Sequence, residues 1–232
     1  MDEDEIRRSA AVERRHWWYA GRRAVVRREL AELPTGRALD VGCGPGGNSD
    51  LLRRLGWDVT ALDYSRGSAL LARTRGLRTL QADGRSLPFA DEAFDLVLST
   101  DAWEHIEEDH LVAAEAHRVL RPGGHLFLMV PAGMDLWSGH DLALGHVRRY
   151  ERDELVDLVE SAGFRVDEVW GWNVLLRPVA RARRRRRSTS QSEMEPVNPV
   201  VNVVLRAIVW IEARLPVRRR RGISLALRAT RP

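Results

Sequence analysis

Apolar positions along the chain follow two alternating patterns. Short apolar runs at residues 37–41, 57–62, 77–82, 93–99, 125–130 and 164–170 predict six β-strands, and residues 223–231 alternate well enough to predict a seventh. Segments between them, namely 48–55, 65–75, 107–120 and 152–162, have the three- and four-residue spacing of amphipathic helices. This alternation predicts an α/β fold with a doubly wound, seven-stranded, mostly parallel sheet covered by helices on both faces.

Two further segments lie outside this alternation. Residues 3–33 predict a helical segment that is broken near Gly21 and ends at Pro34. Residues 172–222 contain a run of arginines, a polar stretch that predicts a mobile loop (Ser188–Glu195), and an apolar helix that Asn198 would cap and that runs to about Leu215. We therefore expect one domain in four parts: an N-terminal helical segment (1–34), a core (35–171), an insertion between strands six and seven formed by an Arg-rich loop and an apolar helix (172–222), and the last strand (223–232).

The charge of the chain is concentrated in two short runs. All 37 basic residues are arginine, and the formal net charge is +4. Arg181 with Arg183–Arg187 supplies +6 and Arg218–Arg221 supplies +4, which leaves −6 for the rest of the chain. An enzyme that acts on nucleic acid more often carries a basic face on its body, so this distribution argues against DNA as a partner.

Sequence features that direct a protein to membranes or to secretion are missing. No apolar run approaches the ~18 residues that a membrane-spanning helix needs. The acidic start, Met1–Glu5, also differs from the basic and then apolar layout of a secretory signal. A cytoplasmic location is therefore expected.

A glycine-rich turn follows the first predicted strand. Asp40, Gly42, Gly44 and Gly46 fit the pattern D-x-G-x-G-x-G, while Gly42, Gly44 and Gly47 fit the dinucleotide pattern G-x-G-x-x-G. In both patterns glycines allow a tight turn and let a ligand approach the backbone. The acid before the turn can pair with a ligand ammonium group, which the methionine end of S-adenosylmethionine (SAM) has and a nicotinamide dinucleotide lacks.

Cys43 is the only cysteine and lies inside this turn. A single cysteine excludes an intramolecular disulfide and a zinc site built on cysteines. We interpret Cys43 as a small residue beside a bound cofactor rather than as a nucleophile.

Two more acidic residues end predicted strands. Asp63 closes the second strand, 21 residues after Gly42, where a carboxylate can accept both ribose hydroxyls of either SAM or NAD. Asp83 closes the third strand and suits the amino group of adenine, although it could instead cap a turn.

The ordered series of motifs extends further along the chain. After Asp83 come Leu87–Leu98 (LPFADEAFDLVL), Glu104-His105-Ile106 and Leu120–Gly124 (LRPGG), the last a turn that no helix can cross. Over residues 36–170 this series closely resembles the class I SAM-dependent methyltransferases of the small-molecule type, the group that contains the ubiquinone-biosynthesis methyltransferases. The resemblance implies a Rossmann-like methyltransferase fold with SAM as the cofactor.

The resemblance also implies roles for individual residues. Asp40, Gly42, Gly44 and Gly46 would contact the methionine and ribose part of SAM, with Cys43 among them. The other implied cofactor contacts are Asp63 at the ribose, Leu62 and Tyr64 beside the adenine, Asp83 and Gly84 at the adenine edge, and Ser99 or Thr100 near the sulfonium. For Tyr64, ordinary packing at a helix entry is the alternative.

The outer segments resemble a bacterial subgroup of this family. These segments are His16–Tyr19 (HWWY) with Gly21–Arg23 (GRR), Trp137–Asp141 (WSGHD) and Gly145–Tyr150 (GHVRRY). The resemblance implies that the N-terminal helix is a lid and that it and the loop after strand five cover the active site, excluding water and aligning the acceptor. Packing of Trp17 on the sheet is the alternative to a role in that lid.

Methyl transfer from a sulfonium requires positioning, and a base if the acceptor is a hydroxyl or amine. The candidate catalytic residues are His140, His105 and His146, of which His140 is the preferred base. His146 belongs to a run that resembles the family's H-x-R-x-Y segment, which locks the loop, and a structural role is favoured for it. Asp135, His140, Asp141 and His146 match no standard metal-ligand spacing, so no metal is expected.

The sequence thus predicts a SAM-dependent methyltransferase acting on an O or N atom of a small molecule, such as a sugar, a glycolipid or a secondary metabolite. The alternatives are a nicotinamide-dependent oxidoreductase, a methyltransferase acting on a peptide or RNA, and a non-catalytic SAM-binding protein. The motif N/D-P-P-Y/F of base-directed DNA methyltransferases is missing, which again argues against DNA.

The insertion has three interpretations. Its arginines and the apolar helix 200–215 could contact an anionic membrane, hold an anionic substrate or RNA, or pack on the domain or a second subunit. The helix is apolar nearly all round, with Asn202, Arg206 and Glu212 as its main polar positions, so we expect some surface to cover it.

Overall fold

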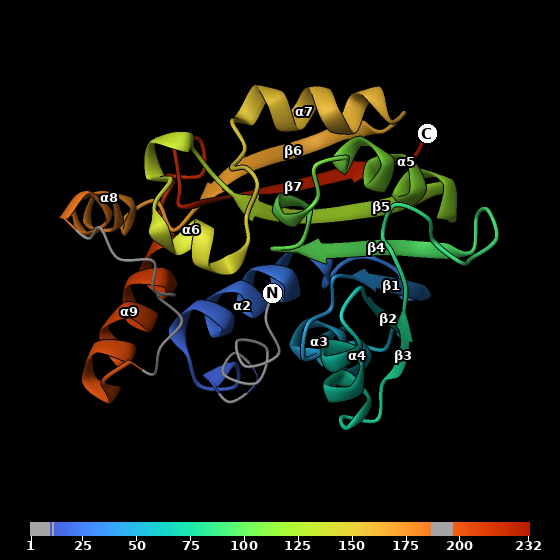
Figure 1. Ribbon diagram of the computed structural model, residues 1–232, viewed down its shortest axis with the longest axis horizontal. Coiled ribbons are helices and arrows are strands. Elements are labelled where there is room, and N and C mark those ends of the chain that lie inside the picture. The colour runs from blue at the N-terminus through green and yellow to red at the C-terminus, as the bar shows by residue number, and fades with distance from the viewer. Residues whose placement is uncertain (1–9, 11, 187–196) are drawn as a thin grey trace.

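The computed structural model describes residues 10, 12–186 and 197–232 (Figure 1). The predicted mobile loop Ser188–Glu195 and residues 3–9 of the predicted N-terminal helix lie outside the described residues, as does Arg187 of the arginine run.

One twisted sheet organises the molecule (Figure 1). Its strands are β1 (Arg37–Val41), β2 (Asp58–Asp63), β3 (Arg78–Gln81), β4 (Phe94–Thr100), β5 (Leu120–Pro131), β6 (Arg165–Trp172) and β7 (Ser224–Thr230). The order is β3-β2-β1-β4-β5-β7-β6; β1 to β5 pair in parallel, and β7 is antiparallel to both β5 and β6. The predicted seven-stranded, mostly parallel sheet is therefore confirmed.

Helices cover both faces of this sheet, as Figure 1 shows. The helices are α2 (Trp17–Leu30), α3 (Gly47–Arg54), α4 (Arg66–Arg73), α5 (Asp109–Val119), α6 (Gly139–Leu144), α7 (Arg152–Ser161), α8 (Arg177–Arg186) and α9 (Pro199–Glu212). Helices α5 and α7 pack on one face with a core that includes Val112 and Leu155, and α2 and α3 pack on the other with a core that includes Val26 and Leu52. The first residues of β1, β2 and β4 agree with the predicted strands to within one position.

Helix α2 differs from the prediction at Gly21. The helix runs unbroken through Gly21, and its first residue follows His16, whose side chain accepts a hydrogen bond from the backbone of Trp18. A Cβ atom on Gly21 would lie 2.9 Å from Val209 of α9 and 3.1 Å from the ring of Trp172. This glycine therefore permits close packing of two segments on α2 and does not break the helix.

Two predicted loops contain helices. Helix α6, with the 3₁₀ turn Met134–Leu136, lies in the segment 131–150 that follows β5, and α8 carries the arginines from Arg177 to Arg186 that were expected in a loop. Arginine has a high helix propensity, which explains how a segment without an apolar stripe forms a helix.

The insertion between β6 and β7 contains the expected apolar helix, α9, and also α8, where a loop was expected. Asn198 caps α9 by accepting a hydrogen bond from Val200, and Pro199 is the first helical residue. The side chain of Asn202 joins α9 to the beginning of α2, because it accepts from the backbone of Trp17 (2.8 Å) and donates to the carbonyl of Arg15 (2.9 Å). In the part of the chain that the structure describes, no helix combines the length and apolarity needed to cross a membrane.

Candidate active site

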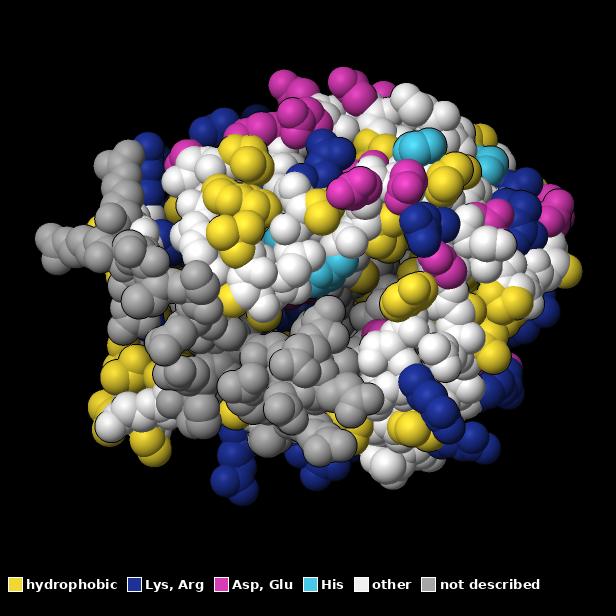
Figure 2. All heavy atoms as spheres, viewed as in Figure 1, with side chains coloured by type: hydrophobic (Ala, Val, Ile, Leu, Met, Phe, Trp, Pro, Cys, Tyr) yellow, Lys and Arg dark blue, Asp and Glu magenta, His cyan; other side chains and the backbone are white. Residues whose placement is uncertain are grey.

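The carboxyl ends of the parallel strands open onto a cavity of about 710 Å³. Its lining comes from the turns after β1, β2 and β4, from α2, and from the segments around α6, α8 and α9. In Figure 2 histidine side chains lie beside the hollow in the middle of one face. The order of the strands reverses between β1 and β4, and such a reversal is where open α/β sheets bind their ligands.

The three glycines of the turn serve two purposes. All three adopt positive φ angles, of 76° at Gly42, 52° at Gly44 and 85° at Gly46. A Cβ on Gly42 would lie 2.4 Å from that of Ala102, and a Cβ on Gly46 would lie 2.7 Å from Leu77, so neither position has room for a side chain. A Cβ on Gly44 would meet no atom within 4 Å, so this glycine presents its backbone to open space in the cavity.

Asp63 stands at the end of β2 and lines the cavity. One carboxylate oxygen accepts from the backbone of Gly44 and the other from that of Ser65, both at 2.8 Å. Burial raises the pKa of Asp63, although these two hydrogen bonds oppose the shift. Asp63 thus fixes the glycine turn and faces the space beside it.

Asp40 is almost fully buried beneath the turn, with 1% of its surface exposed. One of its oxygens accepts from the hydroxyl of Ser49 at 2.5 Å, and the other has no hydrogen-bond partner in the described structure. Burial raises the pKa of Asp40 to about 7, and the nearby positive charge of Arg22 only partly offsets this effect. Asp40 does not line the cavity, in contrast to its predicted contact with the methionine part of SAM.

Helix α2 contributes a charged pair that the sequence analysis did not assign. Arg22 projects from α2 and forms an ion pair with Asp101, just after β4, and both line the cavity. Asp101 has a φ of 53°, a conformation uncommon outside glycine. Asp101 could have been predicted as a site residue, because it is a further acidic residue at the end of a parallel strand. For Arg22, the only signal in the sequence was its position in the GRR motif of the predicted lid.

The residues just before α2 and at its start also close the cavity. Glu13 is buried, accepts from the backbone of Gly47 at 3.1 Å and pairs with Arg75 at 2.5 Å. Trp17, Trp18 and Tyr19 line the cavity together with His16. The ring of Trp18 also packs against that of Trp172 at 4.7 Å, so this segment contributes both to the cavity and to the core.

Thr100 lines the cavity and accepts from the side chain of Asn48 at 2.8 Å, whereas Ser99 is buried and donates to the carbonyl of Val41. Gly84 and Tyr64 line the cavity as well, the latter with 74% of its surface exposed. Cys43 is buried, and burial raises the pKa of its thiol well above the usual value, which suits a packing role rather than a nucleophile.

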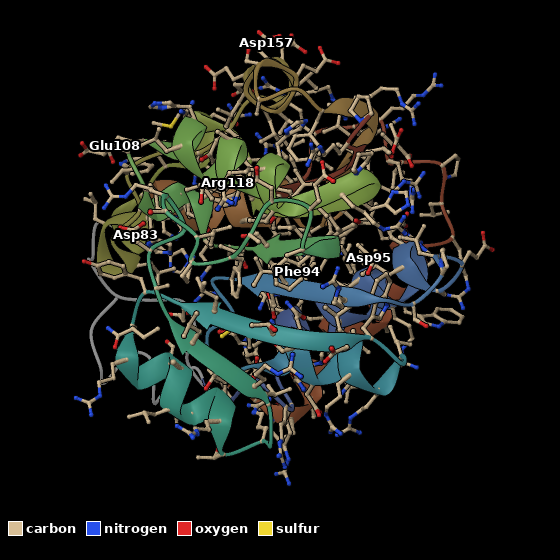
Figure 3. All side chains as sticks on the ribbon, turned by 90° about the vertical axis from the view of Figure 1, so that its right-hand side faces the viewer. Asp83, Phe94, Asp95, Glu108, Arg118 and Asp157 are labelled. Carbon is tan, nitrogen blue, oxygen red and sulfur yellow. The ribbon has the colours of Figure 1, made fainter. Side chains whose placement is uncertain are left out.

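Asp83 does not line the cavity. Its carboxylate accepts from the backbone and side chain of Arg85, which also pairs with Glu108 at 2.8 Å. Figure 3 shows Asp83 and Glu108 close to one another at the same edge of the molecule. These contacts fit the alternative interpretation of Asp83, in which it caps a turn and does not bind adenine.

All three candidate catalytic histidines line the cavity. Nδ1 of His105 lies 3.1 Å from the carbonyl oxygen of Gly145, and the rings of His105 and His146 meet edge to face at 4.8 Å. Burial lowers the pKa of His105 to about 4, and His146 adds to this effect. His105 is therefore neutral at pH 7.

The loop after β5 is held by Asp141, whose side chain is inaccessible to solvent. Asp141 accepts from the backbone of Ser138, from the Arg149 guanidinium at 2.7 Å, and from Nδ1 of His146 at 3.0 Å. Despite burial, which opposes ionisation, the His146 and Arg149 contacts hold the pKa of Asp141 well below its usual range. His140 lies on the same short helix and is largely buried.

The remainder of the H-x-R-x-Y segment ties this loop to α5. The Tyr150 hydroxyl donates to Asp109 at 2.8 Å, and Arg148 pairs with the same carboxylate at 3.0 Å. These contacts hold the loop in place, as predicted for this segment.

The Asp135 carboxylate pairs with Arg177 at 2.5 Å and with Arg181 at 3.4 Å. These two ion pairs argue against Asp135 as a metal ligand.

Residues 39–128 match the model of a family described as a methyltransferase domain. A protein of Mycolicibacterium smegmatis named as a probable SAM-dependent methyltransferase is 33% identical over 161 residues, which cover 67% of this chain and 62% of that protein. The chain thus spans about three fifths of the length of this curated relative.

Two solved structures share the fold. A SAM-dependent methyltransferase of Thermotoga maritima has a TM-score of 0.65 and 22% identity, with 99% of this chain and 96% of that chain covered. A phosphoethanolamine N-methyltransferase of Haemonchus contortus in complex with SAM has a TM-score of 0.63 and 18% identity, with 91% of this chain and 52% of that chain covered. These structures show the shared fold, while the family model and the Mycolicibacterium relative confirm the predicted family, the class I SAM-dependent methyltransferases.

Replacing Asp40 with Asn should remove a pH-dependent loss of stability. The pKa of an aspartate in an unfolded chain is about 3.9, whereas that of buried Asp40 is about 7, so the folded state binds more protons between these values. Relative to Asp40→Asn, the free energy of unfolding of the wild type should therefore fall as pH rises from about 4 to 7, by at most ~1.4 kcal/mol per pH unit. Denaturant unfolding without cofactor at a series of pH values measures this difference.

The exposed carboxylate at the start of β2 provides the matched control, Asp58→Asn. A difference between wild type and Asp40→Asn that stays constant with pH would contradict the buried, proton-binding state of Asp40.

Proposed function

We propose that this chain, which carries the domain of the class I SAM-dependent methyltransferases, transfers a methyl group from SAM to an oxygen or nitrogen atom of a small molecule. The observation that carries the proposal is the composition of the cavity. Gly44 and Asp63, at the ends of β1 and β2, line it together with His105, His140 and His146.

The cofactor side of the cavity has groups that complement SAM. Asp63 offers carboxylate oxygens to the ribose hydroxyls next to the open backbone of Gly44. The methionine end of SAM carries a carboxylate and an ammonium group, for which the Arg22 guanidinium and the Asp101 carboxylate, both of which line the cavity, are the charge complements. When bound, SAM supplies an electrophilic methyl group on its sulfonium.

The acceptor side of the cavity is formed by the locked loop and the insertion. In-line displacement depends on positioning, and the segment from His16 to Arg22 together with α6 and α8 encloses the reacting atoms and excludes water. His140 is the preferred base for a hydroxyl or amine acceptor because it belongs to this enclosing segment and is largely buried.

A nicotinamide-dependent oxidoreductase is the alternative enzyme class, because Gly42, Gly44, Gly47 and Asp63 also fit a dinucleotide. The Arg22–Asp101 pair favours SAM, since it places opposite charges in the cavity where the amino acid end of SAM would lie. A peptide or RNA acceptor is the other alternative, and activity assays with these acceptors distinguish it.

Replacing Asp63 with Asn should weaken the binding of S-adenosylhomocysteine by ~2 kcal/mol or more, because ribose hydroxyls lose a charged acceptor. Isothermal titration calorimetry measures the affinity, with Asp58→Asn at the other end of β2 as the matched control. Parallel titrations with NAD test the oxidoreductase. Binding of NAD but not of S-adenosylhomocysteine by the wild type would refute the methyltransferase assignment.

His140→Gln should lower the turnover number by ~10²-fold or more while leaving the affinity for S-adenosylhomocysteine unchanged, as expected for loss of a general base. Transfer of labelled methyl groups from SAM to fractionated metabolites identifies an acceptor, and turnover is then measured with it. The exposed His110→Gln is the control. Unchanged turnover in His140→Gln would assign the base elsewhere.

We also propose that the outer face of α9 binds an anionic membrane surface. Its inner face packs on α2, but Val200, Val203 and Trp210 on the outer face are 71%, 65% and 59% exposed. Figure 2 shows this hydrophobic patch at the same end of the molecule as α8, a helix rich in arginine. An apolar helical face beside arginines suits the boundary between headgroups and acyl chains.

The double variant Val203→Ser, Trp210→Ser should lower binding to vesicles that contain phosphatidylglycerol by roughly tenfold, because two apolar side chains no longer enter the boundary. Co-sedimentation with vesicles measures the binding, with Leu70→Ser and Leu111→Ser, both exposed elsewhere, as controls. The wild type should bind less at high salt and less to neutral phosphatidylcholine. Absence of wild-type binding at any salt concentration would refute the membrane surface.

A further inference from the structure

Three side chains that are suited to metal coordination converge in the cavity. Glu104 and His105 come from the 3₁₀ turn after β4, and His146 comes from the locked loop 42 positions after Glu104. One ligand atom of each lies within 4.8 Å of the other two, and all three residues line the cavity. The cluster therefore offers two imidazoles and one carboxylate as ligands.

Both imidazoles are held with one nitrogen available. Nδ1 of His105 faces the carbonyl oxygen of Gly145 at 3.1 Å, and Nδ1 of His146 faces Asp141 at 3.0 Å. Carbonyl oxygen and ionised carboxylate only accept, so Nδ1 carries the hydrogen and Nε2 the lone pair in both rings. A second nitrogen that donates to a carbonyl or a carboxylate is the usual arrangement around a metal-bound histidine.

Glu104 supplies a buried carboxyl group that the fold itself does not satisfy. Its side chain is inaccessible to solvent, and neither of its oxygens has a hydrogen-bond partner in the described structure. Oε1 lies 3.8 Å from Nε2 of His146, beyond hydrogen-bond distance. Burial of an unpaired carboxyl group is costly, and a bound cation would remove that cost.

We propose that Glu104, His105 and His146 bind a divalent transition-metal ion through one carboxylate oxygen and two Nε2 atoms. Two imidazoles with one carboxylate favour zinc, iron(II), cobalt or nickel over magnesium and calcium, which prefer oxygen ligands. Bonds of about 2.1 Å place tetrahedral ligands ~3.4 Å apart. The separation of 3.8 Å between Glu104 and His146 is close to this value, and the three ligand atoms, all within 4.8 Å of one another, would have to approach by at most about 1.4 Å.

The remaining coordination positions face the cavity, which defines the role of the metal ion. An oxygen of the acceptor bound there would lose its proton more readily and would be held next to the cofactor side of the cavity. This role of the metal ion in activating the acceptor rests on the proposed methyl transfer. The existence of the metal site does not depend on it. An acceptor with a hydroxyl that can ligate a metal ion, such as a phenol or an enol, fits the site best.

Titration of the untagged protein with Co²⁺ alone tests the site, because visible absorption reports the coordination of this ion. The wild type should bind one Co²⁺ per chain, and Zn²⁺ should displace it. The near-isosteric Glu104→Gln and the variant His146→Gln should each weaken Co²⁺ binding about tenfold or more. The exposed His110→Gln should bind as the wild type does.

Affinity for S-adenosylhomocysteine, measured on the same preparations, separates this proposal from the proposed function. Variants that retain this affinity are folded, and their loss of Co²⁺ binding then supports the site. Absence of stoichiometric Co²⁺ binding by the wild type overturns the metal site, as does equal binding by Glu104→Gln, His146→Gln and His110→Gln. Failure to bind S-adenosylhomocysteine in the wild type would refute the methyltransferase assignment and leave the metal site to be judged by Co²⁺ alone.

Discussion

The geometry of the segment that follows β5, which brings His140 and His146 to the cavity, depends on the buried carboxylate of Asp141. It receives hydrogen bonds from the Ser138 backbone, from His146 and from Arg149, so a single side chain fixes the beginning, the middle and the end of the segment that follows β5. An ionised carboxylate is costly to bury without such donors, so these contacts favour this conformation of the loop. The position and tautomer of His146 then follow from the same contact.

The cofactor side depends on a different constraint, the meeting of parallel strands at one edge. Because β1, β2 and β4 all end there, Asp63 and Asp101 approach the glycine turn from separate parts of the chain. Close packing excludes side chains at Gly42 and Gly46, while Gly44 faces open space. The turn is thus closely packed at Gly42 and Gly46 and open to the cavity at Gly44, which suits a ligand that has to be oriented with precision.

The sheet and its core were largely predictable from the sequence, because apolar runs are local signals, and the strand-end acid Asp63 with the turn glycines Gly42 and Gly44 was placed at the cavity in the same way. Local signals failed at Gly21. Glycine ordinarily interrupts helices, but here its lack of a side chain allows α2 to approach Val209. Helix α6 has only six residues, too few to show a periodic pattern. The convergence of Glu104 with His146 depends on how Asp141 folds the intervening loop, and no local pattern encodes that. Likewise, Asp83 sits where an adenine contact was predicted, but a neighbouring arginine that the strand pattern does not reveal occupies its carboxylate.

The bridge that Asn202 makes between α9 and the start of α2 has a thermodynamic consequence. Its amide holds the backbone of Arg15 and Trp17, and Gly21 brings the same two helices into close contact, so the insertion is tied directly to the segment that covers the cavity. Any partner that orders α9 also orders the entrance to the cavity. By reciprocity of linked equilibria, if the proposed binding at the outer face of α9 changes the affinity of the cavity for a ligand, that ligand changes the binding at α9 by the same factor.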